Sequence, residues 1–293
     1  MKCSLFAGAL SLLLVCRAVF ADTTVPASPF TKDSAKAYIR LFVAQRLEND
    51  IDKLVSYNFM ALETDKVFGN KDDREFDCDD CELSRAVFTL IWGESLPGLT
   101  GELGRGKKWR GDTMNSFRTV FGAETNGTFR GVAKFKAEKE LLETARLFNI
   151  RYHTIGNFTP LPNYWNKAGT LNTYRAGPWK DFFDAFAREL RLCMMNASGA
   201  DKDLDTILVS NRHFFETRRT EADFVAFART SLWDDYLDAD GRPVAVFEPC
   251  WWWDRTLSRK DYIDRATKYA TKAMEIIERR GRKIVDLLKK ELD

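Results

Sequence analysis

The stretch "YHTIGNFTPLPN", residues 152–163, contains one of only two histidines in the chain. A segment with helical spacing leads into it, Gly156 permits a tight turn, and two prolines restrict the backbone that follows. The stretch is therefore predicted to be a loop of fixed shape. Two roles stay open for this loop: it presents His153 as a general base, or it is a structural turn in which the ring nitrogens of His153 are satisfied by neighbouring groups.

Most of the chain around this loop has apolar residues at the three-to-four-residue spacing of a buried helix face. Segments with this spacing are 32–63, 83–94, 136–150, 179–195, 221–237 and 258–293. In contrast, residues 95–112 contain five glycines and one proline and are predicted to form a long irregular loop. Short strands are expected within 125–136 and 244–253. The predicted fold is a mainly α single domain with long irregular loops and a little β structure.

The N-terminal segment has the features of a signal peptide. Lys2 precedes an apolar run, and Val19 and Ala21 supply the small residues expected before a cleavage site. The apolar run is too short to span a bilayer, which takes ~20 residues. The chain is therefore divided into a signal peptide (1–21), a loose lead-in (22–34) and a mainly helical globular domain (35–293). We expect the mature protein to be soluble, secreted or periplasmic, and without a membrane span.

Removal of the signal peptide changes the charge balance. The precursor has a formal net charge of +2, and residues 1–21 contain Lys2 and Arg17 but no acid. The mature chain is therefore expected to be neutral, which gives no global attraction for nucleic acid. No motif indicates a cofactor, so none is predicted, and the partners are left open.

Four cysteines follow the signal peptide: Cys78, Cys81, Cys193 and Cys250. In an exported protein this number predicts two structural disulfides, with three possible connectivities. Cys78 and Cys81 have C-x-x-C spacing, which also suits a redox pair or a zinc site, and free thiols are a further alternative. The acids around this pair disfavour the thiolate that redox chemistry needs. Cys193 and Cys250 lie too far apart in sequence to supply a second close pair for zinc.

Standard catalytic and nucleotide-binding motifs are absent, since the chain has no G-x-x-x-x-G-K-[ST], G-x-S-x-G or H-E-x-x-H. With His153 and His213 as its only histidines, the chain has no three-histidine metal site, and no metal ligands are predicted. His153 is the candidate catalytic base, with Asp112 or Arg85 as its partner. Asp112 is the last residue of the glycine-rich segment, where an aspartate orients a histidine or caps the next helix.

Aromatic and asparagine residues supply candidates for binding. Trp252 lies in the unusual run "CWWWD", residues 250–254, which lines a groove for a sugar or a peptide or packs in the core against the C-terminal helix. The triplets that begin at Asn126, Asn157 and Asn196 match the N-glycosylation pattern. In a bacterial chain these matches would be accidental, and Asn157 is expected to shape its loop.

Four motifs follow one another along the chain: "LIWGESLPG" (90–98), "GDTMNSF" (111–117), "YHTIGNFTPLPN" (152–163) and "WKDFFDAF" (179–186). In this order they resemble a family of uncharacterised bacterial proteins, a domain of unknown function with a W-x-x-x-L-P-G loop and an H-x-I-G-N-F-x-x-L-P-N loop. The resemblance covers roughly Leu83–Leu237 and implies homology without an activity. The residues that match the family pattern are Arg85, Trp92, Pro97, Gly98, Asp112, His153, Gly156, Asn157, Phe158, Pro162 and Asn163.

Trp92, Asn157 and Asn163, which match this pattern, join Trp252 as binding candidates. The signal peptide and the cysteines depart from the family, whose members resemble cytosolic proteins. Two functional hypotheses result. The first is an exported helical binding or effector-type protein without catalysis. The alternative is a hydrolase of nuclease-like type that uses His153 with one of its two partners.

Overall fold

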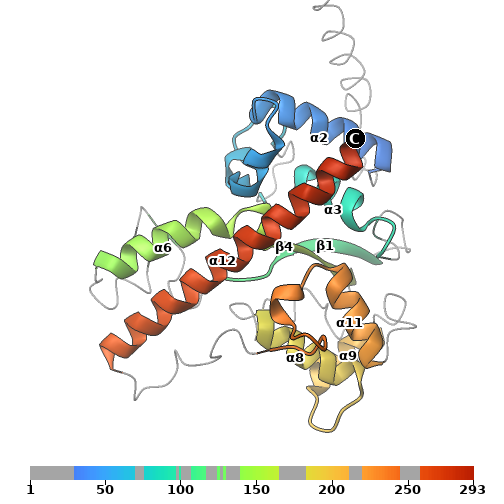
Figure 1. The fold of residues 1–293 in the computed structure, drawn as a ribbon, viewed down its shortest axis with the longest axis vertical. Helices are drawn as coiled ribbons and strands as arrows, with labels where there is room; N and C mark the ends of the chain where they lie inside the picture. The colour runs from blue at the N-terminus through green and yellow to red at the C-terminus, as the bar shows by residue number, and fades with distance from the viewer. Residues whose placement is uncertain are drawn as a thin grey trace, which may run out of the picture.

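A computed structural model gives the arrangement of the chain (Figure 1). It describes residues 30–69, 76–96, 99, 107–116, 124–125, 128–129, 139–164, 183–210, 220–244 and 258–293. Within these ranges the chain is mostly helical and has two small two-stranded sheets, which confirms the predicted mainly α fold with a little β structure. None of the helices in these ranges is long and apolar enough to cross a membrane.

The elements alternate helices with short 3₁₀ turns and strands. The α-helices are α2 (Lys32–Arg46), α3 (Glu82–Trp92), α6 (Lys139–Tyr152), α8 (Phe183–Met194), α9 (Lys202–Ser210), α11 (Glu221–Thr230) and α12 (Arg259–Leu292). The 3₁₀ helices are η1 (Ile51–Ser56), η2 (Phe59–Leu62), η3 (Ile155–Asn157) and η4 (Asp234–Tyr236). The strands are β1 (Lys107–Thr113), β2 (Glu124–Thr125), β3 (Thr128–Phe129) and β4 (Phe158–Tyr164).

Helix α12 is the longest element and runs diagonally across the molecule in Figure 1. It begins after Ser258, which caps the helix because its hydroxyl accepts a hydrogen bond from the Asp261 N–H at 3.1 Å. Its buried residues, among them Ala270, Ile277 and Ile284, recur at helical spacing and face α6, η3, η1 and α3. Because these elements lie about 100 residues or more before α12 in the chain, α12 joins segments that are distant in sequence.

Strands β1 and β4 form an antiparallel pair with Gly111 opposite Pro160 at its centre. Both strands correct the prediction. The glycine-rich segment 95–112, predicted to be irregular, contains most of β1. The proline-rich end of the 152–163 stretch, predicted to be a loop, is strand β4. Neither segment has the local apolar alternation of a strand, because the pair is buried on both faces.

The prolines of β4 are tolerated because of where their missing N–H groups would point. In an antiparallel pair, alternate residues direct their backbone groups toward the partner strand and away from it. The Gly111 N–H points away from β4, to the Asp80 carboxylate at 3.4 Å. Its opposite residue, Pro160, therefore has no cross-strand bond to lose, and Phe158, two positions earlier, likewise directs its carbonyl away from β1 to Arg280.

Helix α2 begins at Lys32, inside the segment 22–34 that is predicted to be a loose lead-in. Thr31 and Ser34 form a capping box, in which the Thr31 N–H donates to the Ser34 hydroxyl at 2.9 Å and the Ser34 N–H donates to the Thr31 hydroxyl at 3.2 Å. The helix therefore starts at the first residue of the segment 32–63 that has helical spacing, three residues before the predicted start of the globular domain at 35. Residues 1–29 lie outside the described ranges, so the signal peptide stays a prediction.

Candidate functional site

His153 follows α6 directly and is half-buried. Its backbone carbonyl accepts a hydrogen bond from the Phe59 N–H at 2.8 Å, and its ring packs edge-on against the Tyr152 ring, with 4.5 Å between centroids. Burial lowers the pKa of His153 to about 4, and a hydrogen bond to the backbone of Asn149 opposes this shift in part. The ring is therefore neutral at pH 7 and a weak proton acceptor there.

Asp112 and Arg85, the predicted partners of His153, each interact with the turn that precedes α3. Arg85 donates to the Asp80 carboxylate through two nitrogens, at 2.9 and 3.3 Å. Asp112, in β1, is 8% exposed, and its charge contributes to the raised pKa of Asp79. Neither Asp112 nor Arg85 is among the groups that shift the pKa of His153. Two of the three catalytic candidates thus share one neighbourhood, and His153 belongs to another.

We name residues 77–81 the acidic turn; it packs directly against β1. A Cβ atom on Gly111 would lie 1.5 Å from the Asp79 carbonyl oxygen, so this contact requires glycine. Burial raises the pKa of Asp79 well above its usual range, and a hydrogen bond with the Asp77 side chain raises it further. The acidic turn therefore favours the protonated form of Asp79 and is a structural contact rather than a free acid–base pair.

Asn157, a predicted binding residue, is fully buried and connects three segments. Its side-chain oxygen accepts a hydrogen bond from the Asn115 N–H at 2.9 Å. Its amide nitrogen donates to the carbonyls of Asn115 and Tyr152, each at 2.9 Å. The Asn115 side chain in turn donates to the Tyr236 hydroxyl at 2.8 Å. This network satisfies the Asn157 amide internally, so the residue shapes the loop, as expected, and has no group left for a ligand.

Trp92, another predicted binding residue, is also part of the core. Its indole N–H donates to the Thr230 carbonyl at 2.7 Å, and the Arg280 guanidinium lies over its ring at 5.7 Å. Arg280 is fully buried, and burial lowers its pKa to about 10, so it keeps its charge at pH 7. Its nitrogens donate to four backbone carbonyls, those of Gly156, Phe158, Ser231 and Leu232.

The predicted disulfides are wrong for the three cysteines that the structure describes, since Cys78, Cys81 and Cys193 are free thiols. Burial raises the pKa of the Cys78 thiol, raises that of Cys81 to about 11 and raises that of Cys193 to about 12. Protonated thiols pack as small apolar groups and are poor nucleophiles, which also opposes a redox role for the C-x-x-C pair. Cys250 lies outside the described residues.

Three other candidates have no described side chain. Trp252 and the second histidine, His213, lie outside the described ranges. Asn163 is described in its backbone, which lies opposite Lys108 in the β1–β4 pair. The predictions for these residues therefore remain untested.

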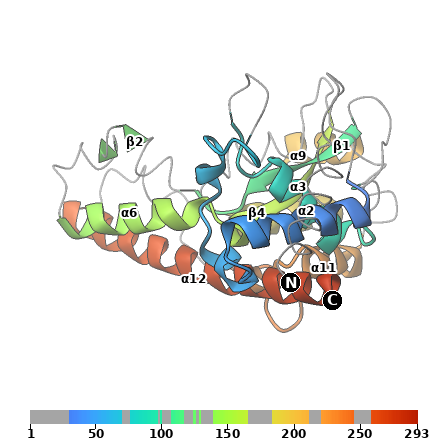
Figure 2. The same ribbon diagram turned by 90° about the horizontal axis from the view of Figure 1, so that it is seen from above.

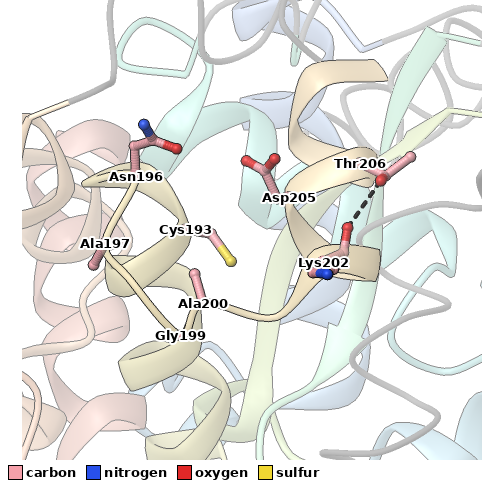
Figure 3. Close-up of a pocket in the computed structure, with 8 residues that line it drawn as sticks. All are labelled: Cys193, Asn196, Ala197, Gly199, Ala200, Lys202, Asp205 and Thr206. Atoms are coloured by element: carbon pink, nitrogen blue, oxygen red, sulfur yellow. Dashed lines mark hydrogen bonds between the residues drawn. The ribbon is translucent and has the colours of Figure 1, made fainter.

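A cavity of about 350 Å³ opens between the end of α8 and the start of α9 (Figure 3). The residues that line it are Cys193, Asn196, Ala197, Gly199, Ala200, Lys202, Asp205 and Thr206. Its size is at the lower end of the range for small-molecule pockets, but its walls carry few apolar groups. The Thr206 hydroxyl donates to the Lys202 carbonyl at 2.8 Å, which leaves the Asn196 and Asp205 side chains as the polar groups of the upper rim.

Sequence reasoning missed Arg280, whose guanidinium donates to backbone carbonyls of the stretch 152–163, which we call the signature loop. The local run of charges, "ERRGRK" at 278–283, suggests a solvated helix face. The signal that identifies it is its position, because Arg280 continues the buried stripe formed by Ala273, Ile277 and Ile284. A charge on the apolar face of a helix indicates a buried and paired group.

Within the described ranges, no group of three or more His, Cys, Asp or Glu side chains is placed to hold a metal ion. The resemblance to the uncharacterised bacterial family stays a prediction. Comparisons of the chain with protein families, with curated proteins and with solved structures found no match.

Proposed function

We propose that the protein is an exported helical binding protein that acts through contact with another protein, and that it is not a hydrolase. The observation that carries this proposal is the state of His153. Its ring is neutral, with a pKa of about 4, and is bonded to the backbone of the helix before it. Its proposed partners Arg85 and Asp112 are engaged at the acidic turn. These contacts favour a role for His153 in the shape of the loop over a role in catalysis.

Helix α6 offers a surface for such a contact. One face of α6 packs on α12, where the Phe148 ring lies 6.5 Å from the Tyr269 ring. The opposite face leaves Leu147 47% exposed and Ile150 52% exposed. Figure 2 shows α6 and the first half of α12 extending side by side away from the other helices. Large apolar side chains that lie together in water are typical of interaction surfaces.

The charges on this face define the chemistry of the partner. Glu143 and Arg146 are exposed and lie on the same side of α6 as Leu147 and Ile150, at spacings of three and four residues. A helix with an apolar stripe, a basic residue to meet Glu143 and an acidic residue to meet Arg146 would complete the surface. The proposed occupant is therefore an amphipathic helix of a partner protein.

Photocrosslinking tests this proposal. A photoreactive phenylalanine analogue replaces Ile150 in the full chain, which is then exposed to extracts of the source organism. We expect one adduct, whose cross-linked peptide has the apolar stripe and flanking charges of the proposed helix. Leu147→Glu should lower the yield about tenfold, because it places an unpaired charge in the contact, at a cost of ~1.4 kcal/mol or more. The matched control carries the analogue at Glu63, an exposed polar position.

Three outcomes would contradict the proposal. An adduct that forms equally well from Glu63, or that survives Leu147→Glu, would show that the α6 face is not the site. An adduct of two copies of this chain would replace the partner protein with self-association. Turnover of a nucleic acid or an ester that His153→Gln abolishes without loss of stability would establish the hydrolase instead.

A further inference from the structure

The chain leaves α8 through an exposed turn at residues 195–200. The Asn196 N–H donates to the Cys193 carbonyl at 3.0 Å, and the Ala197 N–H donates to the Leu192 carbonyl at 2.9 Å, so the helix ends in a hydrogen-bonded turn. Asn196 has a φ of 51°, in the left-handed region that asparagine tolerates better than most residues. The Asn-Ala-Ser triplet therefore occupies a turn of defined shape.

The asparagines of the N-glycosylation matches differ in their exposure to solvent. Asn196 and the hydroxyl residue of its triplet, Ser198, are both exposed. Asn157, in contrast, is 0% exposed, and its amide nitrogen donates to two backbone carbonyls inside the core. A sugar on that nitrogen would replace one of its two hydrogens and so break one of these bonds, and a fully buried side chain leaves no room for the sugar, so the folded chain excludes it. Asn126 lies outside the described residues.

We infer that Asn196 is an acceptor for an N-linked oligosaccharide. The inference depends on export through a eukaryotic secretory pathway and is independent of the contact at α6. The donor is an oligosaccharide on a polyprenyl diphosphate. The Asn196 amide nitrogen forms a bond to the first carbon of the sugar, the bond from that carbon to the diphosphate breaks, and the polyprenyl diphosphate leaves with the bonding electrons. The amide proton passes to a base of the transferase, and nothing is oxidised or reduced.

The cavity beside Asn196 has room for the first sugar. Figure 3 shows Asn196 at its rim, with Asp205 across the opening, Thr206 to the right of Asp205 and Lys202 below it. Carboxylate and ammonium groups bind the hydroxyl and amide groups of a sugar. A Cβ atom on Gly199 would meet nothing within 4 Å, so this side of the turn is open. The polar walls of the cavity suit a carbohydrate better than an apolar ligand.

Expression of the full chain in a yeast secretory host tests the inference. One form keeps its own N-terminus and the other has a host leader before Asp22, so failure of export is distinguished from failure of acceptance. Both carry Asn126→Gln. We expect the secreted protein to lose the mass of one glycan on treatment with peptide-N-glycanase, and heavy-oxygen water to mark Asn196 during that treatment. Ser198→Ala and Asn196→Gln should each abolish the glycan without changing the midpoint of thermal unfolding.

Two measurements separate this site from alternatives. A folded, secreted chain with no glycan at Asn196, from either leader, would overturn the inference, as would a glycan on Asn157 of the folded protein. The cavity is tested with Asp205→Ala, which should leave occupancy unchanged and speed removal of the glycan several-fold, because the first sugar loses a contact. An unchanged removal rate would show that the sugar does not lie in the cavity.

Discussion

Arg280, in α12, connects the stretch 152–163 to the turn after α11 and to Trp92 of α3. Its guanidinium donates to carbonyls at the start of β4 and in the turn after α11, and it lies against the face of Trp92. No carboxylate is hydrogen-bonded to it among the described residues; instead, backbone dipoles surround the charge. Such a group stabilises a fold only while all its partners are in place, since each buried carbonyl left without a donor costs ~1–3 kcal/mol.

Replacement of this arginine should therefore be severe. Arg280→Met is expected to lower the free energy of unfolding by at least ~3 kcal/mol, because four carbonyls lose their donor. Arg280→Lys should also destabilise, because an ammonium group lacks the planar fork that reaches several acceptors. The measurement is urea unfolding followed by tryptophan fluorescence. Arg279→Met is the control: Arg279 is exposed, pairs with Asp235 at 2.9 Å, and its loss should cost within ~1 kcal/mol. Equal losses at the two positions would contradict the role of Arg280.

His153 gives a pH dependence with a definite sign. Its folded pKa of about 4 lies below the ordinary value of 6.5, so the ring is neutral in both states above pH 6.5, and its contribution to stability is fully present there. As the pH falls toward 4, the unfolded chain takes up a proton that the folded chain resists, and stability is lost. His153→Gln should reduce the loss between pH 7 and pH 4 by up to ~3 kcal/mol. Denaturant unfolding of both proteins at the two pH values measures this difference, and identical pH dependence would refute it.

At the scale of elements, the fold depends on the close approach of η3 to α12. A Cβ atom on Gly156 would lie 1.9 Å from the Ile277 carbonyl oxygen and 2.8 Å from the Gly281 nitrogen, both backbone atoms. Gly281 does not interrupt the helix, since α12 continues through it. Gly281 lies beside Gly156, and because neither residue has a side chain, the stretch 152–163 can approach the helix closely.

The two glycines should respond differently to alanine. Gly156→Ala is expected to destabilise by ~3 kcal/mol or more, because backbone atoms of α12 must move to admit the methyl group. A Cβ atom on Gly281 would lie 3.4 Å from a Val55 methyl and 3.6 Å from the Gly156 Cα, which are ordinary contacts. Because Gly281 also lies inside a helix, Gly281→Ala should be neutral or stabilise by up to ~1 kcal/mol. Thermal unfolding of both variants provides the comparison. A similar loss of stability at both positions would show that the contact is symmetric and that η3 is not the restricted partner.

The acidic turn contributes the opposite pH dependence. The pKa of Asp79 is raised by burial and by Asp77, Asp112 and Asp80, so its folded value lies above its unfolded one. The stability from its proton is fully present below the unfolded pKa of ~3.9 and is lost as the pH rises through the folded value. Asp79→Asn, which keeps a donor toward Asp77, should therefore stabilise the protein at pH 7 and change little at pH 3.5.

The control for this prediction is the neighbouring carboxylate. Asp80→Asn should destabilise at pH 7, because Arg85 and Arg110 lose their ion-pair partner at 2.9 and 3.3 Å. Chemical unfolding at both pH values follows the two variants. Destabilisation by Asp79→Asn at pH 7 would mean that the folded chain needs the Asp79 charge, contrary to the raised pKa.

At the scale of the whole molecule, the helices were predictable and the contacts between them were not. Periodic apolar residues predicted most of α2, α3, α6, α8, α11 and α12, because the apolar face of a helix is visible in the spacing of residues within one segment. The sequence did not predict the strands β1 and β4. They pair although they lie about 50 residues apart in the chain, and the residues at their centre, Gly111 and Pro160, are uncommon in strands. The reduced state of Cys78, Cys81 and Cys193 likewise depends on burial, which spacing along the chain does not encode.

The sequence by itself determined the helical class, the cap at Ser258 and the fixed shape of the stretch "YHTIGNFTPLPN". These properties follow from side-chain period and backbone restriction within a few residues. Only the tertiary structure decided which distant groups bind this stretch. The Gly156 carbonyl is bound by Arg280, 124 positions away, and Asn157 is bound by Asn115, 42 positions away. Whether a polar residue reacts or supports the fold depends on such distant partners, since they set its burial and its proton affinity.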